Sequence, residues 1–140
     1  MKRAAWLIIA VALALCASYG CSVSGHRVTV TPALIVRIGL PVYPGAKVRY
    51  GFDLTQSLRE HEMNSVLVTM ETADPVDNVD RFYQKRLGND VSRTAILGRI
   101  QFQLFTTAGQ KVVTLQRLGD VTVIRLQLTN LRLASPTPSP

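Results

Sequence analysis

Aromatic and charged side chains are both scarce in this sequence of 140 residues. Charged residues make up 18% and aromatic residues 6%, whereas hydrophobic residues make up 47%, a balance typical of a folded domain and not of a disordered chain. The only tryptophan is Trp6. The two cysteines and two histidines form no Cys-x-x-Cys pair or other spacing typical of a zinc site.

No apolar run is long enough for a comfortable membrane-spanning helix, which needs about 20 residues. The longest apolar run is Ala4 to Ala17, which contains no charge and follows the basic pair Lys2-Arg3. Small residues, Ser18 and Gly20, then stand three and one positions before Cys21, a spacing that suits signal peptidase cleavage. The sequence therefore predicts a signal peptide over residues 1–20 and export of the remainder.

The stretch Ala17-Ser18-Tyr19-Gly20-Cys21-Ser22 resembles the lipobox of bacterial lipoproteins, although Leu is more usual where Ser18 stands. Cleavage would leave Cys21 as the one thiol of an exported chain, and acylation would occupy it. The resemblance implies lipidation of Cys21 and a membrane anchor in the bacterial cell envelope. Ser22, where a retention Asp could stand, favours the outer membrane facing the periplasm. A secreted or periplasmic protein is the alternative.

The mature chain has room for one domain. We expect a small-residue tether over residues 21–33, a single α+β domain over 34–131 and a disordered Pro-rich tail over 132–140.

The clearest predicted helix starts at Asp74, a good N-cap, followed by Pro75 in the first turn. Apolar residues then recur at helical spacing as far as Leu87, and Gly88 is a typical C-terminal stop. The pattern predicts one amphipathic helix.

After this helix the apolar period changes to two. A hairpin at Gly119-Asp120 pairs Leu115 with Ile124, and a turn centred on Ala108-Gly109 pairs Phe102 with Leu115. Together the two turns place one set of apolar residues on one face: Ile100, Phe102, Leu104, Val113, Leu115, Ile124, Leu126 and Leu128. This predicts an antiparallel meander with one covered face, and hence an α+β fold with one main helix packed across the sheet.

Three further strands are expected upstream of the helix. Ser65 to Thr72 alternates in polarity and leads into the helix, and Lys47 to Leu54 is its predicted partner. Leu34 to Ile38 is interpreted as a third strand.

Two motifs resemble a recurrent group of small bacterial exported proteins, lipoproteins or secreted domains of undetermined function. They are Tyr43-Pro44-Gly45-Ala46 and Thr72-Ala73-Asp74-Pro75, the second leading into Val79-Asp80-Arg81-Phe82-Tyr83. The resemblance covers Leu40 to Leu128. Because each motif also has a structural reading as a turn, a cap or core residues, it identifies a fold more than a site.

Basic residues outnumber acidic ones, but they are spread along the chain. Without Lys2 and Arg3, 14 basic and 9 acidic side chains remain. Nucleic-acid binding would predict a clustered stripe with stacking aromatic residues, and none is visible. A mildly basic surface fits anionic lipid, lipopolysaccharide or cell wall better.

No residue is assigned a catalytic role, and neither a metal nor a cofactor is expected. His61-Glu62 begins like a zinc-protease helix, but Ser65 stands where the second histidine is needed. A small hydrolase or metal-dependent enzyme using His61 with Glu60 or Glu62 remains an alternative.

Three apolar exceptions stand on the otherwise polar face of the predicted meander: Phe105, Val112 and Val123. With Arg125 they form a possible contact face, unless Val28 to Ile38 covers them. The first hypothesis is therefore a non-catalytic binding or assembly module, anchored by lipid, that contacts an envelope protein or a cell-wall polymer. A structural homo-oligomer built through edge strands is a further alternative, and the oligomeric state stays open.

Overall fold

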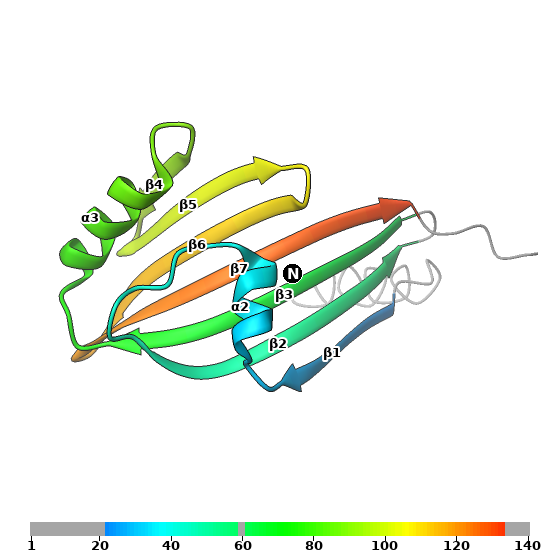
Figure 1. Cartoon of the computed structure of the whole chain (residues 1–140), viewed down its shortest axis with the longest axis horizontal. Helices are drawn as coiled ribbons and strands as arrows, with labels where there is room; N and C mark the ends of the chain where they lie inside the picture. The colour runs from blue at the N-terminus through cyan, green and yellow to red at the C-terminus, as the bar shows by residue number, and fades with distance from the viewer. Residues whose placement is uncertain (1–21, 59–60, 134–140) are drawn as a thin grey trace, which may run out of the picture.

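A computed structural model describes the backbone of residues 22–58 and 61–133 and the side chains of 25–54 and 63–130. These residues form one seven-stranded antiparallel sheet and two α-helices (Figure 1). The strands are β1 (Ser22–Val28), β2 (Lys47–Leu58), β3 (His61–Thr72), β4 (Ser92–Ile96), β5 (Arg99–Thr106), β6 (Gly109–Leu118) and β7 (Val121–Leu133). The helices are α2 (Pro32–Ile38) and α3 (Val76–Leu87). The predicted α+β class and antiparallel sheet are confirmed.

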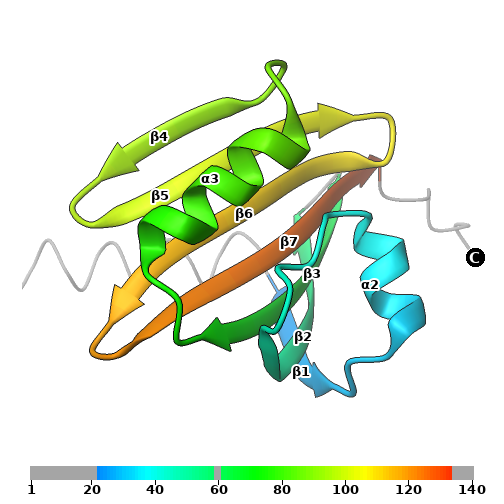
Figure 2. The same ribbon diagram turned by 60° about the vertical axis from the view of Figure 1, so that its left-hand side comes forward.

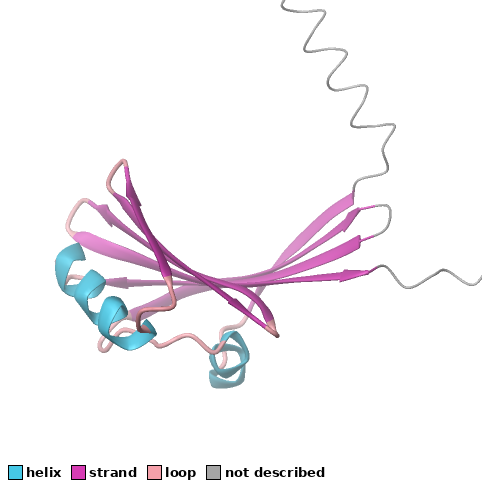
Figure 3. Cartoon of the chain, turned by 90° about the horizontal axis from the view of Figure 1, so that it is seen from above, coloured by secondary structure: helices cyan, strands magenta, loops and turns pink. Residues whose placement is uncertain are grey.

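The strand order is β1-β2-β3-β7-β6-β5-β4, so β3 and β7 lie at the centre. They pair from His61 opposite Leu133 to Thr72 opposite Thr122. The chain leaves β3 through α3 and returns at the far edge as β4, after which β4 to β7 follow as a meander. Figure 2 shows α3 running across β5 and β6, and Figure 3 shows both helices on the same side of the sheet.

The predicted β6–β7 hairpin is confirmed, with Leu115 opposite Ile124. The β5–β6 register is shifted by two residues from the prediction, because Phe102 lies opposite Val113 and not Leu115. The turn is centred one residue earlier than expected, and Gly109, with φ of 123°, already belongs to β6. A two-residue shift preserves the alternation of side chains, so the predicted faces are correct although the pairing was not.

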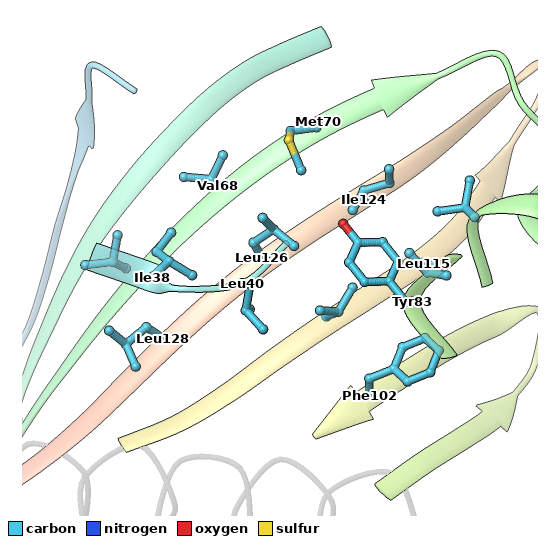
Figure 4. Close-up of a cluster of buried hydrophobic side chains, with 13 residues drawn as sticks. Ile38, Leu40, Val68, Met70, Tyr83, Phe102, Leu115, Ile124, Leu126 and Leu128 are labelled. Carbon is cyan, nitrogen blue, oxygen red and sulfur yellow. The ribbon is translucent and has the colours of Figure 1, made fainter. Parts of the chain in front are cut away.

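The core lies on the helix-covered face. Tyr83 of α3 is fully buried and lies among Phe102, Leu115 and Ile124 (Figure 4). Its ring centroid is 6.1 Å from that of Phe102. Every residue of the predicted apolar face belongs to or packs against this cluster, with Ile100 and Leu104 partly buried and the other six buried.

Helix α3 begins one residue later than predicted, with Val76 and not Pro75 as its first residue. Pro75 occupies the N-cap position, which has no side-chain cap hydrogen bond. The Asp74 carboxylate instead accepts a hydrogen bond from Tyr43, so the prediction of an Asp74 cap was wrong. The predicted stop is confirmed, since Gly88 is the C-cap with φ of 78°.

The N-terminal part of the chain differs most from the sequence prediction. Ser22 to Val28, expected as a tether, forms β1 and pairs along its whole length with β2. The predicted domain boundary at residue 34 is therefore wrong, because the sheet already begins at Ser22. At the other end β7 continues to Leu133, into the predicted 132–140 tail, whose remaining residues 134–140 lie outside the described part.

The strand predicted over Leu34 to Ile38 is a helix. The Thr31 hydroxyl accepts a hydrogen bond from the Leu34 amide at 3.2 Å, and Pro32 occupies the first turn. Gly39, with φ of 62°, closes the helix. Local capping thus decides the conformation of a short apolar run that periodicity alone leaves ambiguous.

An ion pair fastens edge strand β4 to α3. Arg93 Nε donates to Asp80 Oδ1 at 3.0 Å and Arg93 Nη2 donates to Oδ2 at 2.8 Å, while Gln84 also donates to Oδ2. Asp80 is buried, and its hydrogen bonds raise the pKa of the Arg93 guanidinium. Because β4 is exposed along its length, this bidentate contact is its main attachment to the helix.

We expect Asp80→Asn to lower the free energy of unfolding by about 1.5–3 kcal/mol, because it removes charge-assisted hydrogen bonds at a buried carboxylate. Glu71→Gln is the matched control. It breaks the more exposed Arg49–Glu71 ion pair and should cost less than about 1 kcal/mol. Urea unfolding of the three proteins measures both effects, and equal losses would contradict the structural role of Asp80.

Tyr83→Phe tests the buried hydroxyl, which donates to the Pro41 carbonyl at 3.0 Å. Burial raises the pKa of Tyr83 in the folded state, whereas an unfolded tyrosine ionises near pH 10. The contribution of this group is therefore complete below about pH 10 and is lost as the pH rises further. The variant should cost about 1 kcal/mol at neutral pH and show a shallower alkaline loss of stability. An unchanged alkaline slope in urea unfolding would contradict this.

Candidate functional site

The candidate site is the face of the sheet turned away from α2 and α3, called the helix-free face below. In an antiparallel sheet, directly opposed residues point to the same side, so the register assigns its members. One row crosses all seven strands and contains Arg27, Phe52, Leu67, Gln127, Val112, Gln103 and Ser92. The next row contains Tyr50, Thr69, Arg125, Thr114, Gln101 and Thr94. None of the described helices lies on this side (Figure 3).

All four predicted contact residues lie on the helix-free face, but they do not form one exposed patch. Phe105 is 79% exposed near the end of β5, whereas Val112 and Val123 are only 8% and 6% exposed. Arg125 is half-buried. Within its row Val112 is flanked by Gln103 and Gln127, so it forms an apolar floor between amide side chains.

The N-terminal segment does not cover these residues, contrary to one expectation. Ile38 of α2 is fully buried in the core cluster, which places α2 on the opposite face. Among the described residues, the helix-free face is therefore not covered by α2 or α3.

Hydroxyl and amide groups on this face bond to one another. Gln127 Nε2 donates to Ser65 Oγ at 2.9 Å and to Thr129 Oγ1 at 3.1 Å, and these two hydroxyls lie 3.0 Å apart. Thr69, in register with Arg125, is 2% exposed, and its hydroxyl has no hydrogen-bond partner among the described residues. The central part of the face is thus polar and closely packed.

The aromatic residues of β2, Tyr50 and Phe52, also belong to this face, although they were not among the predicted contact residues. The Tyr50 and Phe52 rings meet edge to face with centroids 5.7 Å apart, and the Arg27 guanidinium carbon lies 5.5 Å from the Tyr50 centroid. Tyr50 and Phe52 stand two positions apart, a spacing that in a strand indicates side chains on the same face. The bulge between Val48 and Tyr50 changes the parity of the strand, however, and only the structure reveals it.

A second polar cluster joins the two motifs of the family resemblance. Tyr43 Oη donates to Asp74 Oδ2 at 2.7 Å, and this hydrogen bond is the main cause of the raised pKa of Tyr43. Arg117 Nη1 and Thr122 Oγ1 donate to the Asp74 carbonyl at 3.1 and 2.7 Å. The Tyr43 ring also meets Phe82 at 5.2 Å. These groups satisfy one another, so the cluster serves to pack the loop before β2 against α3 and the β6–β7 turn.

A hollow of about 820 Å³ lies beside the β5–β6 turn. Among the described residues of its lining, which include Met63, Phe105, Leu128 and Asn130, Arg37 is the only charged one. No acid, histidine or cysteine is among these described lining residues.

The remaining predicted sites lie where the structure gives no side-chain positions. Cys21 and Glu60 are outside the described residues, and His61 and Glu62 are described only as backbone at the start of β3. Elsewhere in the described chain, no group of three or more His, Cys, Asp or Glu side chains is arranged to hold a metal ion. In the same part of the chain, no helix combines the length and apolar character needed to cross a membrane.

Comparison of the sequence with protein-family models and curated proteins, and of the structure with solved structures, found no match.

Proposed function

We propose that the protein is a lipid-anchored, non-catalytic binding module of the bacterial cell envelope. In this proposal the helix-free face binds an envelope protein or a cell-wall polymer. The observation that carries the proposal is a face spanning seven strands on which no described helix packs, with arginine and amide side chains around an apolar floor. The basic start, short apolar run and lipobox-like segment ending at Cys21 support export and anchoring.

The position of β1 determines which part of the sheet the proposed anchor would hold near the membrane. Ser22 is already paired with Ser57 of β2, so only one peptide unit, about 3.8 Å between α-carbons, separates the sheet from Cys21. An acylated Cys21 would hold the N-terminal end of β1, at one edge of the sheet, beside the lipid headgroups. The β4 edge lies six strand spacings away, or roughly 29 Å across the sheet before its twist is considered.

This arrangement suits a binding module because it limits how the sheet can turn. A flexible linker would let the domain present any surface, whereas an anchor joined directly to β1 keeps one sheet edge towards the membrane. The helix-free face then stands beside the bilayer surface, open to a polymer or protein of the envelope.

Cys21→Ser tests the anchor. We expect the wild-type protein to partition into detergent and its mature N-terminus to carry acyl mass on Cys21, because only the thiol is modified. The variant should lose both properties. Mass spectrometry of the N-terminal peptide measures the modification, and a wild-type protein with an intact leader or an unmodified Cys21 would contradict the proposal.

Tryptophan reporters test the orientation. In a Trp6→Phe background, Leu54→Trp places the only tryptophan opposite Gly25 of β1, at a position 36% exposed. Leu97→Trp, at a position 99% exposed in the β4–β5 turn, is the control near the opposite edge. Energy transfer to dansyl-labelled headgroups in reconstituted vesicles should be stronger from the first reporter. Equal transfer would show that the anchor does not orient the sheet.

A further inference from the structure

Charge is distributed unequally between the two sides of the sheet. Five basic side chains belong to the helix-free face: Arg27, Lys47, Arg49, Arg99 and Arg125. Glu71 is the only acid there among the described side chains, and it is paired with Arg49. Helix α3, on the other side of the sheet, carries the acids Asp77 and Asp80 together with the basic residues Arg81, Lys85 and Arg86. A positive field of this kind attracts polyanions.

Three of these arginines lie in successive rows of the sheet. Arg27 is in the row of Gln127, Arg125 is in the next row, and Arg99 is in the row after that. From β1 to β7 there are three strand spacings and from β7 to β5 two, or roughly 14 Å and 10 Å across the strands. The cations therefore mark a diagonal line across the face.

This spacing indicates the shape of the ligand. Arginines on backbone positions roughly 10 to 14 Å apart across the strands are spread too widely to form one compact cluster of donors around a small anion. They can pair with anionic groups repeated along an extended chain. Between them the face offers hydrogen-bonding amides and hydroxyls, including Gln101, Gln116 and Thr114.

The aromatic pair beside Arg27, Tyr50 and Phe52, favours a polysaccharide over a single-stranded nucleic acid. Nucleic acids stack bases on free ring faces. Here the Arg27 guanidinium lies over the Tyr50 ring, which also meets the Phe52 ring edge to face. Amide and hydroxyl side chains, by contrast, suit the hydroxyl groups of sugars.

We propose that the helix-free face binds an extended anionic polysaccharide bearing carboxylate or phosphate groups, which lies diagonally across the strands. Arg27, Arg125 and Arg99 pair with anionic groups along the chain, and the amides between them bond to its hydroxyl groups. This inference rests on the proposed function and specifies the class of polymer that the face takes.

The test measures binding of polygalacturonate over a range of salt concentrations. It uses the mature protein, produced by expression of the full-length sequence. Arg125→Gln should weaken binding about 3- to 5-fold, and the triple change of Arg27, Arg99 and Arg125 to Gln at least about 30-fold. The slope of log K against log salt should fall by about one for each arginine removed. Neutral dextran should not bind.

The matched control removes three positive charges from α3, by changing Arg81, Lys85 and Arg86 to Gln. It has the same net charge as the triple variant but leaves the helix-free face intact, so its affinity should stay within about 2-fold of wild type. Equal weakening in both variants would overturn the proposal, because the attraction would then depend only on net charge. Thermal unfolding of both variants confirms that they are folded.

Two further outcomes separate this inference from the proposed function. If poly(dT) binds more tightly than polygalacturonate, or if polygalacturonate does not bind, the polysaccharide assignment is wrong. A photo-crosslinker at the Gln103 position that captures a defined envelope protein would still support the binding module in that case. Absence of both polymer binding and crosslinking, in a protein whose Cys21 is acylated, would reject the two proposals together.

Discussion

The pairing of β3 with β7 is the interaction on which the remainder of this structure depends. These strands are adjacent in the sheet although α3 and three other strands separate them in the chain. Their register places Val68 opposite Leu126 and Met70 opposite Ile124, all of which are buried on the helix-covered face. Because a shift of one residue would turn this apolar set towards the other side, hydrophobic burial holds the register in place. The same register then determines which residues form the helix-free face.

The two sides of the sheet consequently meet different physical demands. On one side, α2 and α3 bury the apolar set, and the Asp80–Arg93 pair attaches the exposed β4 strand. On the other side no described helix contributes, yet Val112 and Val123 are still buried among neighbouring polar residues. An antiparallel sheet can leave one face to solvent. Its composition is then free to serve recognition, which is the role we propose for it.

The motifs of the family resemblance have a clear structural role. Tyr43 bonds to Asp74 and meets the ring of Phe82, while the Tyr83 hydroxyl bonds to the Pro41 carbonyl. Residues from two separate motifs thus pack into one cluster at the start of α3. This arrangement gives both motifs a packing role without requiring that they form a binding site.

The sequence by itself determined the features that depend on local periodicity and local stops. It predicted the end of α3 at Gly88, the β6–β7 hairpin and the composition of both meander faces, because alternation survives even the two-residue shift between β5 and β6. Tertiary structure decided the features for which local signals are weak. Ser22 to Val28 forms β1 because the backbone groups of β2 are available to pair with it. Arg27 and Arg99 share a face with Arg125 only because β3 pairs with β7 and joins the two halves of the sheet. Such long-range pairing leaves no periodic trace in a short polar segment, since its hydrogen bonds are made by the backbone and not by the side chains.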